Sequence, residues 1–429
     1  MKHMQSIQRR AAAILAVAGG LSGLASAQSL AVTNGVVLAT DTDLAPGCGG
    51  ATFGGSFFTD AMSTGLGGNV LFRGRLTGAG VAPINERAYF YGSTRAGLTL
   101  VMRGNDPEPS GTIPFATLNS ATAQGLGGTP RLTESGMMLF GATMSGGTGM
   151  TTANDTALFT GTPGSFSILV REGDATPGGG GSTMTSSFSS PSNQSTGMNA
   201  AGTAFFQTAL LGGDVVASPS NNAAWIMGTP GSLTMVRRKG DTIPSGEIVS
   251  ALGFVSQINA SGQFLHEETL STTLGAPAAT VSNNVVLYIY TPGFGNQLVV
   301  REGDAAPGTA GATFNVTSNS WFINTSGNSF NSAGQTIMRC DLMNGDVITG
   351  LNDSALYIGS TSGMTLLARR GDVAPGTGGM TFNVFNNSNV QISNSGRVSF
   401  TATLAGATAT DDGCIFEGFP GSLNLVVRE

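Results

Sequence analysis

The sequence predicts an all-β fold, a β-propeller of about six four-stranded blades. Two observations carry this prediction: a segment of about 65 residues recurs six times, and each copy contains short runs in which apolar and polar residues alternate. No stretch after the first 27 residues has a sustained helical period. Radial repetition of four-stranded sheets suits such a repeat because it leaves only short strand edges exposed. Another tandem β-repeat architecture, or seven blades, is the alternative.

The composition is that of a glycine-rich protein with a packed core. Gly accounts for 65 of the 429 residues, hydrophobic residues for 40 % and charged residues for only 10 %. The hydrophobic share is sufficient for a core and argues against wholesale disorder. The 25 acidic residues outnumber the 19 Lys and Arg residues, and no basic stripe occurs, so nucleic acid is not an expected partner.

The first 27 residues have the three parts of a secretory signal peptide. Lys2, Arg9 and Arg10 form a basic region, residues 11–24 are apolar but too few for a membrane span, and residues 25–27 (Ala-Ser-Ala) form a small-residue cleavage pattern. We expect residues 28–429 to form a single repeat domain with no transmembrane segment after signal cleavage. The expected location is extracellular after secretion, with the periplasm or the cell surface as alternatives.

Each repeat contains an apolar strand that ends in Arg and leads into an Asp and a Pro-Gly turn, as in Leu298–Gly308. This repeat motif has four clear copies, with the residues Arg171 and Asp174, Arg238 and Asp241, Arg301 and Asp304, and Arg369 and Asp372. Because Asp in a turn readily accepts backbone N–H groups, we expect each Asp to cap its own turn. Each Arg should then pair with a nearby carboxylate, its own Asp being one candidate.

A ring of these carboxylates that binds Ca²⁺ is the alternative interpretation of the repeat motif. Calcium loops crowd several Asp residues within about a dozen positions, whereas these recur about 65 residues apart. His266 is the only histidine after residue 27, which excludes zinc or iron sites built from several histidines. We therefore expect no metal and no other cofactor. The disulfide state of Cys48, Cys340 and Cys414 is left open.

A second marker, Asn-x-x-Gly, keeps the same phase as the repeat motif. It occurs as Asn199–Gly202, Asn259–Gly262 and Asn331–Gly334, with degenerate copies in the other repeats. These markers resemble a family of secreted bacterial proteins that is defined by tandem N-x-x-G-x-x-x-F-type repeats with variable C-terminal anchors. The resemblance covers essentially the whole mature chain and implies secretion but no established activity. The sequence ends at Glu429 without a hydrophobic tail or basic cluster, which favours release over anchoring.

One repeat breaks the pattern of the others at His266 and Glu268. Along the strand that follows Asn-x-x-Gly, His266 takes the position of Phe in most repeats, and Glu268 takes a position that is otherwise small. Side chains two residues apart on a strand share a face, so we expect a buried, hydrogen-bonded structural pair. The alternative is a ligand-binding site specific to this repeat. The opposite face of the same strands is predicted to be solvated, with the residues Arg73, Arg75, Gln207, Glu267, Arg339 and Asp341.

No residue is assigned a catalytic role. Turn formers, strand formers and the Arg–Asp motif make up the repeat, so we expect a secreted, non-catalytic protein. It would bind an unknown extracellular ligand, a glycan or a protein, or serve as a structural component. The alternative is a carbohydrate-active enzyme with loop carboxylates at one mouth of the propeller channel, because glycoside cleavage requires paired carboxylates. The fold alone does not decide between them.

Overall fold

The computed structural model describes the following residues: 31–33, 36–54, 62–64, 68–113, 116–119, 126, 130–189, 195–217, 220–316, 321, 323, 329–386 and 389–429. The predicted signal peptide lies outside them. The chain divides into two compact units, Met1–Val215 with Ile226–Met235, and Val216–Trp225 with Val236–Glu429. A single repeat domain over residues 28–429 stays a prediction.

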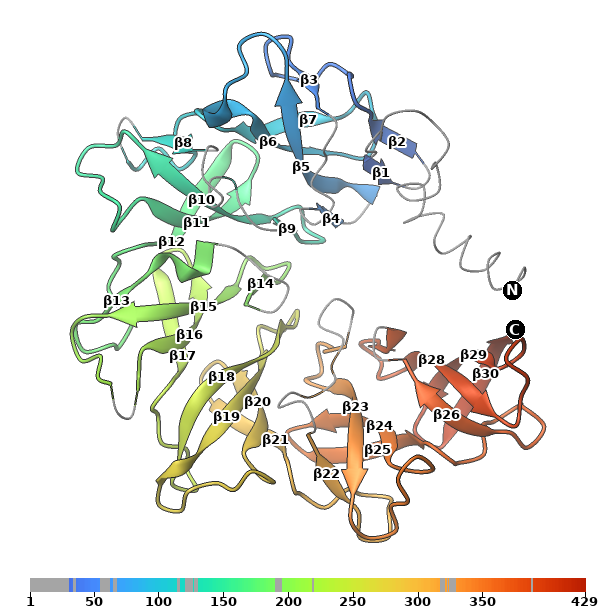
Figure 1. Ribbon diagram of the computed structural model, residues 1–429. Coiled ribbons are helices and arrows are strands. Elements are labelled where there is room, and N and C mark those ends of the chain that lie inside the picture. The colour runs from blue at the N-terminus through green and yellow to red at the C-terminus, as the bar shows by residue number, and fades with distance from the viewer. Residues whose placement is uncertain are drawn as a thin grey trace. The chain divides into compact units, whose positions relative to one another are not determined.

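Six antiparallel sheets, here called blades 1 to 6, follow one another along the chain, and four strands of each lie in sequential order (Figure 1). The strands of the first three blades are, in blade 1, β3 (Thr52–Phe53), β5 (Val70–Thr77), β6 (Arg87–Gly92) and β7 (Thr99–Arg103); in blade 2, β8 (Thr117–Asn119), β10 (Met138–Ser145), β11 (Thr156–Thr162) and β12 (Ser165–Arg171); and in blade 3, β13 (Thr183–Met184), β15 (Ala204–Leu211), β16 (Ala223–Thr229) and β17 (Ser232–Arg238). Those of the last three are, in blade 4, β18 (Glu247–Ile258), β19 (Phe264–Gly275), β20 (Val285–Thr291) and β21 (Gly295–Arg301); in blade 5, β22 (Thr313–Asn315), β23 (Thr336–Met343), β24 (Ser354–Ser360) and β25 (Gly363–Arg369); and in blade 6, β26 (Thr381–Phe385), β28 (Val398–Ala405), β29 (Gly413–Phe419) and β30 (Ser422–Arg428).

Shorter elements complete the described chain. Four short strands pair with the second strand of their blades: β4 (Met62–Thr64), β9 (Arg131–Leu132), β14 (Thr196–Met198) and β27 (Gln391–Ile392). The remaining elements are a separate hairpin of β1 (Ala31–Thr33) and β2 (Val36–Ala39), and two 3-10 turns, η2 (Pro83–Asn85) and η3 (Ser186–Ser189). The predicted fold class, all-β with six four-stranded antiparallel blades, is confirmed.

In blades 1 and 4 the first half of the second strand is buried on both of its faces, which corrects one expectation from the sequence. Arg73 and Glu267 were predicted on a solvated face, yet both are buried. Arg73 Nη1 donates to the Leu126 carbonyl at 2.8 Å, and the Trp321 N–H donates to Glu267 Oε2 at 2.7 Å. In each case the partner residue comes from the following blade: Leu126 precedes β9 and Trp321 precedes β23. Their backbone groups bind the side chains that were expected to meet water. Arg75 is exposed, as predicted.

The Asp of the repeat motif closes the turn that follows the last strand of a blade. The backbone N–H of the motif Arg donates to the Asp carboxylate three residues later, at 2.7 Å for Arg171 and Asp174 and at 2.8 Å for Arg301 and Asp304. The same bond joins the other two clear copies, Arg238 to Asp241 and Arg369 to Asp372. This is the geometry of a capped turn, in which a side chain satisfies a backbone donor that has left the sheet.

The Arg side chain of the motif has a partner that the sequence analysis did not foresee. Its Nε donates to a backbone carbonyl 17 or 18 residues earlier, as in Arg301 to Asn283 at 2.7 Å and Arg369 to Asn352 at 2.8 Å. The same bond occurs from Arg171 and Arg238. Carboxylate pairs with residues other than the motif Asp occur as well, from Arg301 to Glu247 and from Arg369 to Asp346. The motif Asp was therefore the wrong candidate, because the backbone N–H already engages it.

The Asn-x-x-Gly turns link one blade to the next. In Asn259–Gly262 the Gly has φ +77°, a backbone conformation that favours glycine. The Asn259 side chain accepts the N–H of Gln263 with its oxygen and donates from Nδ2 to the Asn331 carbonyl at 2.7 Å. Asn331 repeats this arrangement one blade further on and donates to the Ser393 carbonyl at 2.9 Å. Each of these amides therefore supports its own turn and the turn of the following blade.

Candidate functional site

The two residues that break the repeat pattern, His266 and Glu268, lie side by side on β19. Both side chains are fully buried, with 0 % of their surface exposed. His266 Nδ1 lies 3.3 Å from Glu268 Oε1, without forming a well-aligned hydrogen bond. The His266 ring stacks between Phe264 and Tyr288, at centroid distances of 5.2 and 5.9 Å. The sequence analysis placed the two residues on one interior face, and the structure brings them together there.

Two further polar residues complete a buried cluster around this pair. Arg237, on β17, donates from Nε to Glu268 Oε1 at 2.6 Å and lies over the ring of Tyr288. Asn296, on β21, places its side-chain oxygen 2.9 Å from His266 Nε2 and donates to the Val236 carbonyl at 2.9 Å. We call Arg237, His266, Glu268 and Asn296 the buried polar cluster. It ties the last strand of blade 3 to two strands of blade 4.

Arg237 and Asn296 were not expected in this cluster, although the repeat contains a signal for both. Arg237 directly precedes the motif Arg, at a position that other repeats fill with an apolar residue: Met102, Val170, Val300, Ala368 and Val427. Asn296 lies five residues before the motif Arg, where other repeats have Leu98, Phe166, Leu233, Met364 and Leu423. The four residues of the cluster are therefore all polar exceptions at positions where other repeats have apolar or small residues.

Burial sets the protonation of the cluster. Burial lowers the pKa of His266 to about 3, against the effect of the hydrogen bond to Asn296, so the imidazole is neutral at physiological pH. Burial raises the pKa of Glu268 to about 7, while Arg237 opposes this shift. Among the atoms of the described residues, Glu268 Oε2 has no hydrogen-bond partner. The cluster thus consists of an arginine hydrogen-bonded to a carboxyl group that titrates near pH 7, with a neutral histidine beside it.

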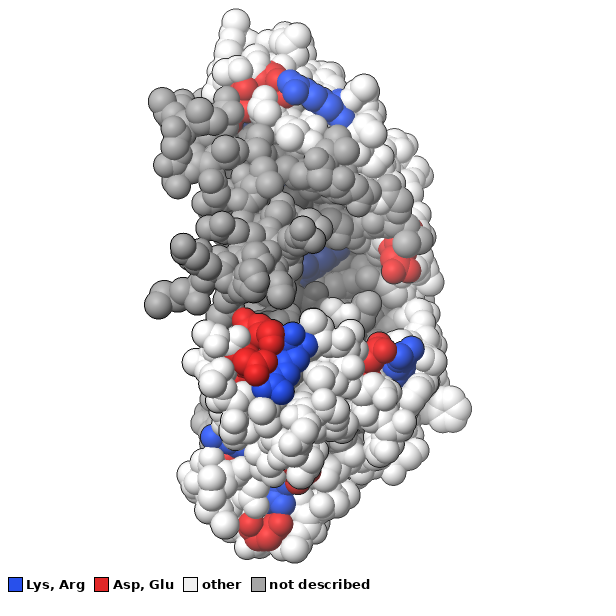
Figure 2. All heavy atoms as spheres, turned by 90° about the vertical axis from the view of Figure 1, so that its right-hand side faces the viewer, with Lys and Arg blue, Asp and Glu red and all other residues white. Residues whose placement is uncertain are grey.

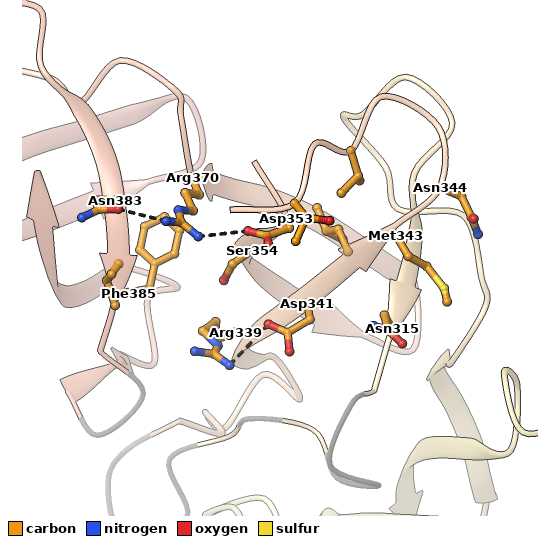
Figure 3. Close-up of a pocket in the computed structure, with 14 residues that line it drawn as sticks. Asn315, Arg339, Asp341, Met343, Asn344, Asp353, Ser354, Arg370, Asn383 and Phe385 are labelled. Carbon is orange, nitrogen blue, oxygen red and sulfur yellow. Dashed lines mark hydrogen bonds and ion pairs between the residues drawn. The ribbon is translucent and has the colours of Figure 1, made fainter. Parts of the chain in front are cut away.

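The full burial of His266 and Glu268 supports the structural-pair interpretation and gives a ligand no direct access to them. Binding at these two residues stays a prediction. A partly open hollow lies elsewhere in the same unit, between blades 5 and 6, and has a volume of about 470 Å³. Figure 3 shows β23, the loop after it and β26 around this hollow, which we call the inter-blade pocket.

Two arginine–carboxylate pairs line the inter-blade pocket (Figure 3). Arg339 Nη2 lies 3.3 Å from Asp341 Oδ1, both on β23. Arg370, directly after β25, reaches Asp353 Oδ1 at 3.2 Å with Nη1 and the Asn383 side-chain oxygen at 3.2 Å with Nη2. These four charged side chains are each between 21 % and 27 % exposed. Arg339 and Asp341, predicted on a solvated face, thus line a hollow between two blades.

The ionisation of Asp353 is fixed by its neighbours. Burial opposes the charged form, but the Gly350 N–H at 2.7 Å and the Arg370 guanidinium together hold the pKa of Asp353 below its ordinary value. The carboxylate is therefore ionised at neutral pH and acts as a hydrogen-bond acceptor rather than as a proton donor.

An irregularity in β26 opens the pocket. The register of β26 against β28 shifts between Phe382 and Val384, as in a β-bulge. Val384 is 50 % exposed, whereas Val316, the equivalent residue one blade earlier, is 6 % exposed. Sequence periodicity carries no signal for such a shift, because the two segments have the same residues, Thr-Phe-Asn-Val.

Other potential sites are limited in the part of the chain that the structure describes. No group of three or more His, Cys, Asp or Glu residues there is arranged to hold a metal ion. The three cysteines are free and buried, and burial raises the pKa of the Cys48 thiol to about 11. On the face drawn in Figure 2, Lys and Arg atoms lie beside Asp and Glu atoms rather than in a patch of one sign. No helix among the described residues is long and apolar enough to cross a membrane.

Comparison with known proteins gives one family match. A family model described as a family of unknown function (DUF7453) matches residues 12–267 and 66–429. The chain thus belongs to a family of unknown function, whereas the tandem-repeat family that the markers resemble, and secretion, stay predictions. No curated protein matches the chain.

Three solved structures illustrate the fold-level likeness. The β-propeller domain of the Trilobed protease from Pyrococcus furiosus is 8 % identical, with 88 % of this chain and 85 % of that chain covered at a TM-score of 0.36. The six-bladed fucose-binding lectin of Aleuria aurantia is 9 % identical, with 86 % and 93 % covered at 0.26. An ulvan lyase of polysaccharide lyase family PL25 is 8 % identical, with 86 % and 83 % covered at 0.31. Likenesses at this level assign no activity to this chain.

Proposed function

Because the chain belongs to the family of unknown function DUF7453, we propose a role from its own geometry: it is a non-catalytic protein that binds a glycan in the inter-blade pocket. The proposed place of action is outside the cell, as the signal-like residues 1–27 suggest. The single observation that carries the proposal is the presence of two arginine–carboxylate pairs on one hollow of about 470 Å³.

The lining of the pocket suits a ligand rich in hydroxyl groups. A sugar hydroxyl both donates and accepts hydrogen bonds, so its site needs carboxylates or amide oxygens together with Arg or amide N–H groups. Asp341 and Asp353 provide the first kind, Arg339 and Arg370 the second, and Asn383 provides both. The volume lies within the range of about 300–1,000 Å³ that is typical of small-molecule sites.

The ionisation of Asp353 favours binding over catalysis at this residue. Glycoside cleavage needs a carboxylic acid that is protonated near neutral pH, whereas Asp353 has a lowered pKa. Glu268 has a pKa near 7, but it is fully buried in blade 4 and does not line the pocket. A carbohydrate-active enzyme remains the alternative that the same experiment tests.

The test is a glycan array and a glycoside-cleavage screen on the purified, exported protein. The pocket variant Arg370→Glu with Asp353→Asn installs the residue types that blade 4 has at the equivalent positions. Its control, Arg397→Glu with Glu417→Asn, makes the same change in charge at an exposed ion pair of blade 6. We expect binding by the wild type and the control, loss of binding in the pocket variant, and no cleavage product. Equal binding by the pocket variant, or release of product, would contradict the proposal.

Export has its own test. The protein recovered from the culture medium or the cell envelope should begin at Gln28, as N-terminal sequencing would report. An intact N-terminus on cytoplasmic protein would overturn the proposed location.

A further inference from the structure

We infer that the ligand of the inter-blade pocket is a neutral sugar unit rather than a uronate or a sulfated sugar; this inference rests on the proposed function. The pocket presents two positive and two negative side chains, so its formal charges cancel. Each Arg already has a carboxylate within 3.3 Å. The paired charges of the pocket therefore favour a ligand that carries no net charge.

The internal pairing leaves no uncompensated cation for an anionic ligand. Arg370 uses Nη1 on Asp353 and Nη2 on Asn383, so two of its donors are engaged before a ligand enters. A ligand carboxylate or sulfate that replaced these partners would lie beside Asp353, and like charges at such separations repel. Hydroxyl groups carry no such penalty, because they can donate to the carboxylates and accept from the guanidinium groups without displacing either.

The equivalent positions of blade 4 show that the charge balance is particular to this pocket. Two residues of blade 4, Glu267 and Glu302, occupy the positions of Arg339 and Arg370. Both are buried, and they accept backbone N–H groups of the following segment, those of Trp321 and Val316.

The residues beside these two positions change in the opposite sense. Where blade 4 has Thr269 and Asn284, blade 5 has Asp341 and Asp353. The two acids of blade 4 are thus replaced by two bases in blade 5, and two neutral residues are replaced by two acids. Replacing the two acids by two bases would, by itself, increase the affinity for an anion. Replacing the two neutral residues by two acids cancels that positive charge.

Apolar side chains complete the lining on the β26 side. Val384 is half-exposed and lines the pocket, as does the buried Phe385, which Figure 3 labels. A sugar ring has an apolar C–H face as well as hydroxyl groups, so apolar side chains beside paired charges fit a neutral ring. A strongly hydrated sulfate group would lose water against the same side chains without compensation.

The experiment measures the affinity of the exported protein for three sets of hexasaccharides by titration calorimetry. The neutral set contains maltohexaose, cellohexaose, xylohexaose and mannohexaose; the carboxylated set contains hexagalacturonate and hexamannuronate; the third set is the neutral set after chemical sulfation. We expect at least tenfold tighter binding of the best neutral probe. Tighter binding of a carboxylated or sulfated probe overturns the inference and leaves glycan binding intact. Binding of none of the probes overturns the proposed function itself.

Two nearly isosteric variants test the cause of the preference. Asp341→Asn and Asp353→Asn each remove one negative charge, and each should reduce the preference for neutral over carboxylated probes about tenfold. Glu417→Gln, an equal change at an exposed ion pair of blade 6, should leave the preference unchanged. A preference that both pocket variants retain in full would contradict the charge argument. The wild-type titration remains decisive if a variant fails to fold, which its thermal unfolding curve would show.

Discussion

Blades 4 and 5 use the same strand positions in opposite ways. On β19 of blade 4, His266, Glu267 and Glu268 are fully buried and engaged by neighbouring segments. On β23 of blade 5, the charged Arg339 and Asp341 pair with each other and line a hollow. The comparison shows that one repeat can place charge in a packed junction or on a recognition surface by changing a few residues, without changing the strand order.

The largest expected effect concerns the buried polar cluster of blade 4. His266→Phe with Glu268→Ala restores the residue types of other blades but leaves Arg237 buried without its carboxylate. We expect a loss of about 3–5 kcal/mol in the free energy of unfolding, because an uncompensated buried charge is costly. Adding Arg237→Val and Asn296→Leu should recover most of this loss, because apolar groups then replace the whole cluster. Denaturant unfolding of the two variants measures both effects; equal stabilities would contradict the role of Arg237.

The second effect is the pH dependence of the same cluster. The pKa of Glu268 is about 7 in the folded protein, against an ordinary value of 4.5, so the folded state holds the proton more tightly. Its contribution to stability is full below about pH 4.5 and is lost as the pH rises through about 7. The difference in unfolding free energy between wild type and Glu268→Gln should therefore fall by about 3 kcal/mol between about pH 4 and pH 8. A difference that is independent of pH would show that Glu268 stays ionised in the folded protein.

Exchanging the equivalent residue pairs of blades 4 and 5 tests the comparison directly. Glu302→Arg with Asn284→Asp gives blade 4 the pair of blade 5 and removes the acceptor of the Val316 N–H. We expect a loss of about 1–3 kcal/mol, because a buried donor loses its partner. The reverse exchange, Arg370→Glu with Asp353→Asn, should change stability by less than about 1 kcal/mol, because that pair is partly exposed. If urea titration gave the two exchange variants equal losses in unfolding free energy, the proposed difference between blades 4 and 5 would be wrong.

The smallest effect concerns a feature that the two blades share. Asp304→Ala and Asp372→Ala should each cost about 1–2 kcal/mol, because each removes the acceptor of a backbone N–H in the turn. Addition of calcium should leave the melting temperature of the wild type unchanged. A calcium-dependent rise that both variants abolish would support the carboxylate ring instead of the capped turn.

The fold could be predicted because its signals are local and repeated. An Asp three residues after Arg and a Gly three residues after Asn each define a turn, and the period between them defines the blade. His266 and Glu268 were visible for the same reason, as exceptions to a repeat. The pocket could not be predicted, because it depends on a register shift next to Asn383 and on which faces of two sheets meet. Glu267 was misplaced because alternation along one strand does not reveal that another segment covers its polar face.

The link between Asn-x-x-Gly turns bears on how this protein ages. Asn259 and Asn331 each use one amide oxygen to hold their own turn and the amide nitrogen to hold the next. Spontaneous deamidation would convert either residue to Asp, which keeps the acceptor, loses the donor and places a negative charge against a carbonyl oxygen. One such chemical event leaves the residue's own turn its acceptor but breaks the hydrogen bond that links two adjacent blades. The lifetime of the fold is therefore tied to the slow chemistry of a few asparagine side chains as well as to its equilibrium stability.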